Sequence, residues 1–256
     1  MLDVLRTIAE EAPNEHPILG DKTARDLRQQ VRTRETATGD DPSPDATLNS
    51  LQLHWRLGHA ELKLSNLDEG IDRYNKVFDG LTRLSNKHNV EIPPPIDLQL
   101  AYDLGVAHMR RGETSNCCRR NSPDSCLLPI KGDGVYTDQG DAKQAITYFT
   151  KVLRNSRKES PLHLKARWLL NIAYMTISGY PDQVPREYLI EPSVFDSDEP
   201  FPRFMNVAGT LGLNTFHGTI RKGIWYKLCF LTHFFSNSLR RPVNGYAILF
   251  QSAVPT

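Results

Sequence analysis

The sequence has few cysteines, almost no net charge and no long apolar run. Among 256 residues, 4 are cysteine, and 31 Lys and Arg against 30 Asp and Glu leave a formal charge of +1. A balanced charge indicates neither a nucleic-acid partner nor an acidic tail. The most hydrophobic stretch is "WYKLCFLTHFF", which Lys227 and His233 interrupt. It is shorter than the ~20 residues that span a bilayer. We therefore expect no membrane span and no nucleic-acid binding.

The N-terminal stretch "MLDVLRTIAEEAPNEHP" does not look like a secretory signal. Asp3, Glu10 and Glu11 interrupt it, and it has no apolar centre. Cytoplasm is the default expectation from these residues. With 39% hydrophobic and 24% charged residues, the chain suits a globular protein of one large domain or two small ones.

Motifs of common enzyme classes are also missing. The chain contains no G-x-S-x-G, no H-E-x-x-H and no phosphate-binding loop. Candidate acid–base pairs are Asp97 with Asp103 and His108 with Glu113. No motif supports either pair, and two residues six apart lie on different faces of a helix. We expect no catalytic residue, no metal and no cofactor, and keep an enzyme of unknown reaction as an alternative.

What the chain does contain is a recurring helical pattern. In residues 51–81, apolar residues recur at helical spacing on both sides of "SNLDEG". Gly58 lies inside the first of these helices, where glycine costs roughly 1 kcal/mol against alanine. Close packing of the second helix against Gly58 and Gly70 would explain it.

The same pattern returns twice. Leu104-Gly105 matches Leu57-Gly58, and Ala145 and Phe149 have the spacing of Gly70 and Tyr74. A degenerate third copy has Leu170-Asn171 in this place. The pattern resembles the tetratricopeptide repeat (TPR), a helical hairpin with small residues at the crossing. It predicts an all-α fold of TPR-like hairpins; a generic helical bundle with coincidental Leu-Gly pairs is the alternative.

The spacing also sets the expected organisation. Gly58 and Gly70 are 12 positions apart, but Gly105 and Ala145 are 40 apart, which indicates a loop inserted within the second hairpin. The segments that we expect are a helical lead and linker at 1–47, a repeat domain at 48–190 with the insertion at 113–140, an extended linker at 191–216, and an atypical tail at 217–256.

Three of the four cysteines lie in the insertion, in "NCCRRNSPDSC". A haem site would need C-x-x-C-H, which is missing, and zinc would need a fourth ligand and paired spacing. "KGDG" lacks the context of a phosphate-binding loop. Two alternatives stay open: three free thiols, or a disulfide from Cys117 or Cys118 to Cys126, which requires an oxidising compartment.

Three stretches together carry a more specific resemblance. They are "NCC…SCLLPIKGDGV", "ARWLLNIAYMTISGYPDQVP" and "FPRFMNVAGTLGL". The region from about Ala9 to Thr215 is similar to the N-terminal part of FG-GAP/VCBS-repeat proteins of the ASPIC/UnbV type, which are related to cartilage acidic protein. In those proteins a helical segment precedes a β-propeller. Tyr136 stands where a histidine is common, so no ligand role carries over to it.

The resemblance implies an extracytoplasmic, non-catalytic protein that interacts with other proteins or glycans. It also implies a disulfide between Cys117 and Cys126, with Cys118 as an extra thiol. No Asp-rich propeller loop follows Phe216, and the tail at 217–256 has no acidic residue. This abrupt change indicates an alternative or frameshifted end, or else a genuine hydrophobic tail.

A helical-repeat array offers a groove lined by the first helix of each hairpin. We expect a protein–protein interaction module whose groove takes an acidic peptide or a C-terminal carboxylate. The alternative is a purely structural cap of a propeller, in which case the isolated chain should self-associate. The groove candidates are basic, polar and aromatic: Gln52, Trp55, His59, Lys63, Gln99, Tyr102, Arg110, Lys165 and Trp168.

Overall fold

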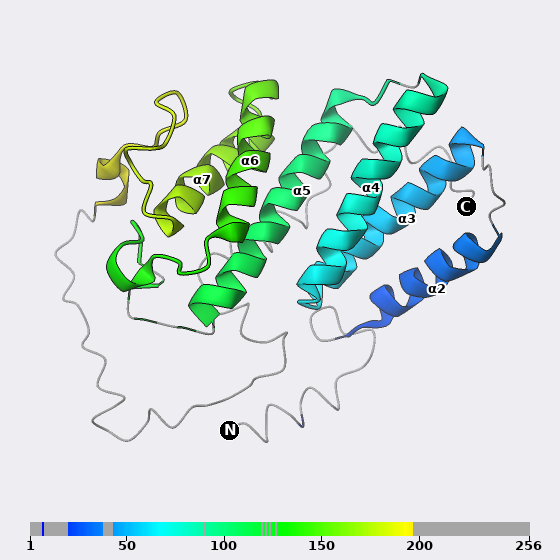
Figure 1. Cartoon of the computed structure of the whole chain (residues 1–256), viewed down its shortest axis with the longest axis horizontal. Helices are drawn as coiled ribbons and strands as arrows, with labels where there is room; N and C mark the ends of the chain where they lie inside the picture. Colours follow the sequence, from blue (N-terminus) through cyan, green and yellow to red (C-terminus); the bar gives the residue numbers. More distant parts are fainter. Residues whose placement is uncertain are drawn as a thin grey trace. The chain divides into compact units, whose positions relative to one another are not determined.

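The protein is all-α over the part of the chain that the computed structural model describes, which is residue 7 and residues 20–37, 43–89, 91–118, 120, 122, 124–125 and 127–196. These residues contain helices and no strand, as the periodicity predicts. The helices are α2 (Lys22–Ala37), α3 (Pro44–Lys63), α4 (Leu67–His88), α5 (Pro94–Glu113), α6 (Gly140–Asn155) and α7 (Pro161–Thr176). Figure 1 shows them following one another in chain order, each beside the next.

The first hairpin, α3–α4, closes where two glycines meet. A Cβ on Gly58 would lie 2.6 Å from Cε1 of Tyr74, and a Cβ on Gly70 would lie 2.8 Å from the Leu62 side chain. Each of these two Cβ positions is also 3.3 Å from the other glycine's carbonyl oxygen. The close approach predicted at Gly58 and Gly70 is thus confirmed, because no side chain fits between the two backbones.

The second hairpin, α5–α6, repeats this crossing. A Cβ on Gly105 would lie 2.6 Å from Cε1 of Phe149, and Ala145 is fully buried. Phe149 therefore covers Gly105 as Tyr74 covers Gly58. Both rings are completely buried, so each hairpin has one aromatic ring seated on a glycine of the preceding helix.

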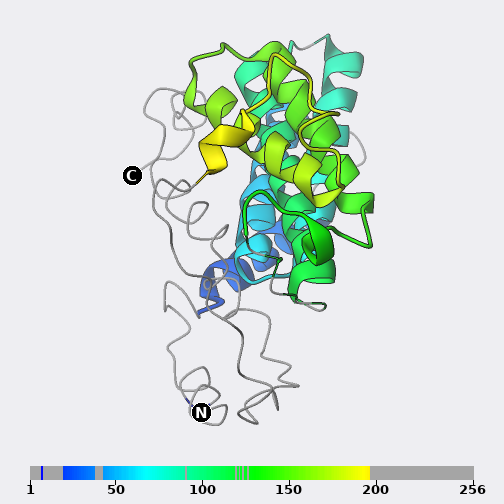
Figure 2. The same cartoon turned by 90° about the vertical axis from the view of Figure 1, so that its left-hand side faces the viewer.

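The third copy has no second helix in the described residues. Asn171 stands in α7 where the first two copies have glycine, and its Nδ2 donates to the carbonyl oxygen of Tyr188 at 2.9 Å. The amide of Ile190 donates back to Asn171 Oδ1 at 3.0 Å. An irregular segment, 177–195, therefore covers this face of α7 and ends in the short turn η3 (Pro192–Phe195). Figure 2 shows this yellow segment over α7.

Helix α2, in the N-terminal lead expected at 1–47, packs directly on the first repeat hairpin, which the sequence does not predict. Helix α2 buries Ala24, Leu27 and Val31 against Leu57 and Ala60 of α3. Helix α3 begins at Pro44, four residues before the expected start at residue 48. The reason is a local N-cap: the Ser43 side chain accepts from the Ala46 amide, and proline is preorganised for the first helical position.

The insertion runs between the expected bounds, since α5 ends at Glu113 and α6 begins at Gly140. Its expected lack of helix is wrong in two places, because the chain forms a π-helical turn, η1 (Thr114–Cys118), and a 3₁₀ turn, η2 (Gly132–Gly134). Asn116 ties the two ends of the insertion together by hydrogen bonds. Its Nδ2 donates to the carbonyl oxygens of Gly112 and Asp138, and its Oδ1 accepts from the Asp138 amide.

Two sets of predictions concern residues outside the described part. Cys117 is buried at the end of η1, but Cys126 and the Cys118 side chain lie outside it, so the Cys117–Cys126 disulfide stays a prediction. The linker beyond Asp196 and the whole tail lie outside it too. In the part that is described, no helix combines the length and the apolar character needed to cross a bilayer.

The junction of α2, α3 and α4 buries a histidine that should make stability depend on pH. His54 Nδ1 lies 3.4 Å from Arg73, and its Nε2 lies 3.6 Å from Glu35, which also binds Lys76. Burial lowers the pKa of His54 from 6.5 to about 4; Lys76 and Arg73 act in the same direction and Glu35 opposes them. The unfolded chain therefore takes up this proton before the folded chain does.

We expect the free energy of unfolding to fall by about 2–3 kcal/mol as pH drops from 6.5 to about 4, and to regain this on return. Urea unfolding of the wild type and of His54→Leu at several pH values would measure it. Carboxylates titrate in both proteins, so the difference between them isolates His54. Parallel pH curves for the two proteins would contradict this assignment.

Candidate functional site

A buried carboxylate joins α3 to α5 on the face where we expect the groove. Asp103 is 4% exposed, and Trp55 Nε1 donates to its Oδ2 at 2.8 Å. Gln99, one turn earlier on α5, donates from Nε2 to the other oxygen, Oδ1, at 2.9 Å. Both oxygens of Asp103 are thus bound by two predicted groove residues, Trp55 and Gln99.

His59 extends this cluster to α4. Its Nε2 lies 3.4 Å from Asp103 Oδ2, and its Nδ1 lies 2.8 Å from the hydroxyl of Tyr74. The His59 and Tyr74 rings meet edge to face, with centroids 5.4 Å apart. When the Tyr74 hydroxyl donates to Nδ1, the proton of the imidazole sits on Nε2 and points toward Asp103. Tyr74 therefore links the groove face to the glycine crossing beneath it.

The electrostatics of the cluster are those of a buried acid held by neighbouring donors. Burial raises the pKa of Asp103 above its usual value, while His59 and the hydrogen bonds from Trp55 and Gln99 oppose the rise. Burial also raises the pKa of Tyr74 well above 10, with Asp103 adding to this rise and Arg110 opposing it. Arg110 thus acts on the same cluster from the next turns of α5.

Asp103 itself is not placed to meet a ligand. Its oxygens are occupied and buried, whereas the His59 side chain is 41% exposed and Trp55 is half-buried. What the cluster presents to solvent is therefore an imidazole and an indole in fixed orientations. Gln52 and Lys63 lie on the same face of α3, at helical spacing from His59, and Lys63 is exposed.

The remaining groove candidates separate into core and surface. Tyr102 is 7% exposed and packs against Phe149 with ring centroids 6.0 Å apart, so it belongs to the core of the second hairpin. Lys165 and Trp168 are half-buried on α7. Trp168 contacts Phe195 of η3, with ring centroids 5.5 Å apart. Trp55 and Trp168 occupy equivalent positions, three residues before Gly58 and Asn171 respectively.

The two acid–base pairs considered from the sequence have other partners. Asp97 binds Lys151 of α6 at 2.7 Å, and Asp103 belongs to the cluster above. His108 Nδ1 lies 2.7 Å from Asp141, a residue that the sequence reasoning missed. Burial raises the pKa of Asp141, but hydrogen bonds from His108 and Arg111 outweigh it, so the pKa lies below its usual value.

This second network connects the two hairpins. Arg111 donates to both oxygens of Asp141 on α6 and to Asp68 on α4 at 2.8 Å. Tyr148 stacks on the His108 ring at 5.7 Å. Asp141 sits in the first turn of α6, where a carboxylate favours the helix dipole. The position of Asp141 at the start of a helix was enough to predict a structural role for its carboxylate. Its partners, which lie 30 and 33 residues away in the sequence, were not predictable.

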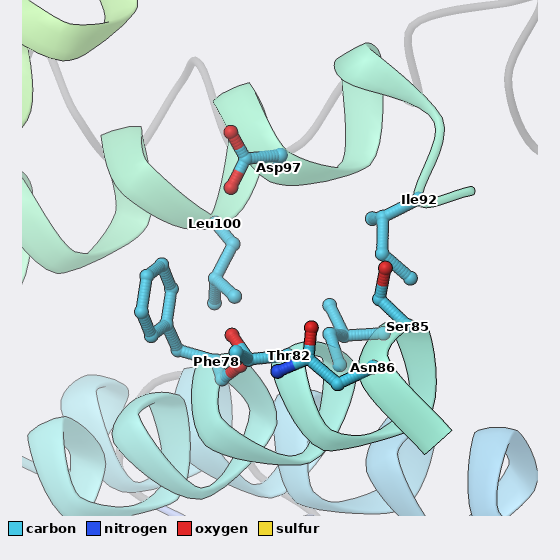
Figure 3. A pocket seen from close by; sticks show the side chains of 8 residues that line it. Phe78, Thr82, Ser85, Asn86, Ile92, Asp97 and Leu100 are labelled. Atoms are coloured by element: carbon cyan, nitrogen blue, oxygen red, sulfur yellow. Dashed lines mark hydrogen bonds between the residues drawn. The ribbon is translucent and has the colours of Figure 1, made fainter. Parts of the chain in front are cut away.

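A pocket of ≈ 190 Å³ lies elsewhere, between α4 and α5 (Figure 3). Leu100 and Ile92 point toward α4, and Asp97 lies on the α5 side (Figure 3). Lys151 Nζ lies over the ring of Phe78, 5.1 Å from its centroid. None of the predicted groove residues lines this pocket. Its lining residues are Phe78, Leu81, Thr82, Ser85, Asn86, Ile92, Asp97 and Leu100.

Among the residues that the structure places, no group of three or more His, Cys, Asp or Glu side chains is arranged to hold a metal ion. Compared with protein-family models, with curated proteins and with solved structures, the chain gives no match. The similarity to the ASPIC/UnbV type and the assignment to the tetratricopeptide repeat therefore remain predictions from the sequence.

Proposed function

We propose that the hairpins are TPR-like repeats and form a non-enzymatic protein-interaction module that binds an acidic peptide segment along α3 and α5. The repeat assignment rests on the matched crossings, in which Tyr74 covers Gly58 and Phe149 covers Gly105. Such an array uses the first helices of its hairpins as a binding surface. From the sequence resemblance to proteins of the ASPIC/UnbV type, we also propose that the module is part of a larger FG-GAP/VCBS-repeat protein.

The observation that carries the proposal is the fixed orientation of Trp55 and His59 on Asp103. A binding surface gains affinity when its side chains are held in place before the ligand arrives, because less conformational entropy is lost. Trp55 offers an apolar ring with one polar edge already satisfied. Exposed Lys63 and half-buried Arg110 add positive charge to this surface, which favours an acidic ligand over a basic one.

The first experiment is a peptide array probed with the full chain. The array holds random peptides of about 12 residues, long enough to span two helices of the groove. It is made in two copies. The peptides of one copy end in a free carboxylate, and those of the other end in an amide. We expect bound peptides to be enriched in Asp and Glu, and their affinity to fall at least about tenfold in Lys63→Glu, equivalent to about 1.4 kcal/mol. Binding should also weaken as salt is raised, since exposed charges are screened.

Lys143→Glu is the matched control, because Lys143 is exposed on α6, a second helix of a hairpin. It makes the same charge change away from the proposed surface and should leave the affinity within about twofold. Equal losses in both variants would indicate a non-specific charge effect and contradict the site. An array without binders, together with self-association of the chain by light scattering, would instead favour the structural cap.

A further inference from the structure

Beyond α3 and α5, the face of α7 already carries a contact of the kind that a ligand would make. Phe195 of η3 lies against Trp168, with ring centroids 5.5 Å apart and an interplanar angle of 37°. It also meets Tyr180 edge to face, with centroids 5.9 Å apart at 89°. Phe195 is half-buried, whereas its neighbour Val194 is 63% exposed. The turn therefore directs its aromatic side chain, and not its aliphatic one, onto α7.

Hydrogen bonds that do not involve Phe195 hold the residues on which it packs. Arg167 of α7 donates to the carbonyl oxygens of Tyr188 and Leu189. The Tyr180 hydroxyl donates to the carbonyl oxygen of Ile190 at 2.7 Å. These bonds fix the chain up to Ile190, so the two rings that receive Phe195 keep their places when Phe195 leaves. Aromatic pairs of this offset and edge-to-face geometry are mutually attractive.

The segment that delivers Phe195 has the chemistry proposed for the groove ligand. Residues 190–199 read "IEPSVFDSDE", with four acidic residues, one aromatic residue and no basic residue. Lys165, which is half-buried, stands one turn before Trp168 on α7 and places a positive charge near this contact. The position equivalent to Trp55 is thus covered, in the third copy, by an acidic aromatic segment of the same chain.

We propose that Trp168 and Tyr180 form a binding site for an aromatic side chain of an acidic segment, and that Phe195 occupies this site in cis. The inference rests on the proposed function and extends it by naming the ligand class at α7 and an intramolecular competitor for it. A tethered segment competes at an effective concentration on the order of millimolar. A partner segment therefore gains this part of the surface when it displaces Phe195.

The test uses the full chain, a Phe195→Ala variant and a fluorescent peptide of residues 190–199. Anisotropy titrations up to millimolar protein should show the peptide binding Phe195→Ala at least about tenfold more tightly than the wild type, because the cis competitor is removed. The same peptide with alanine at its phenylalanine should bind neither protein. Equal affinity for both proteins, or no binding to Phe195→Ala, would overturn the proposal.

Two further variants identify the site. Trp168→Ala in the Phe195→Ala background should abolish peptide binding, while Lys143→Ala in that background, at an exposed position of α6 outside the site, should retain it. Far-ultraviolet circular dichroism confirms folding of each variant. If array peptides bind the wild type in a Lys63-dependent way but residues 190–199 bind no variant, this inference fails and the proposed function stands. If residues 190–199 bind Phe195→Ala and the array has no binder, the α3–α5 groove fails instead.

Discussion

Gly58→Val is expected to lower the free energy of unfolding by about 3 kcal/mol, at the upper end of what overpacking a core typically costs. A Cβ alone at this position would stand 2.6 Å from the Tyr74 ring and 3.3 Å from the Gly70 carbonyl oxygen. Tyr74 has no room to retreat, because it is fully buried and its hydroxyl is bound to His59. The two helices must therefore separate. Urea unfolding followed by circular dichroism measures the loss.

Gly105→Val gives the same test on the second hairpin, where an added Cβ would lie 2.6 Å from Cε1 of Phe149. Arg56→Val is the control, because Arg56 is exposed on α3 and the change carries the helix-propensity cost of valine without the clash. We expect it to cost about 0.5 kcal/mol or less. A Gly58 variant as stable as this control would show that the hairpin does not depend on the crossing.

Asp103→Ala is expected to destabilise the protein by about 2–3 kcal/mol, because two donors lose their acceptor, at roughly 1–3 kcal/mol for each group that stays buried. The donors are the Trp55 indole and the Gln99 amide, both half-buried. The proposed peptide affinity should fall with it, since Trp55 and His59 lose their fixed orientations. Asp103→Asn preserves the shape and one acceptor, and should cost less than the alanine variant in both respects.

The pH dependence separates the roles of shape and charge at this position. Because burial raises the pKa of Asp103, the folded chain binds this proton more tightly than the unfolded chain. The contribution of Asp103 to stability is therefore greatest at low pH and declines as pH rises from about 4 through the folded pKa. Asp103→Asn lacks this decline. A pH-independent difference between Asp103→Asn and the wild type would contradict a buried carboxylate.

Local patterns in the sequence were enough to predict the helices and the close helix crossings of the first two hairpins. Gly58 and Gly105 stand out because glycine is unfavourable inside a helix, and the distance from Gly105 to Ala145 places the insertion between residues 113 and 140. The packing of α2 on α3 is not predictable in this way. Its three apolar residues are visible in the sequence, but nothing in their spacing says which helix they meet.

The candidate site is predictable in part. The repeat register alone predicts that Trp55, His59 and Gln99 share one surface, and the structure brings all three to Asp103. Asp103, which organises them, enters from the sequence only as half of an acid pair, since its contact with Trp55 spans 48 positions and depends on how α3 meets α5. Tyr102, which the register also places in the groove, is 7% exposed, because an aromatic residue there can turn inward and pack against Phe149.

The insertion has a consequence for the order in which the hairpins form. Residues 64–66 join α3 to α4, whereas residues 114–139 join α5 to α6. Closing the longer loop costs about 2 kcal/mol more entropy on a logarithmic length dependence. The first hairpin is thus the more easily formed nucleus, and the second can condense on a surface that already exists. The bonds of Asn116 to both ends of the insertion are native contacts that offset the cost of closing it, and we expect the first hairpin to form before the second.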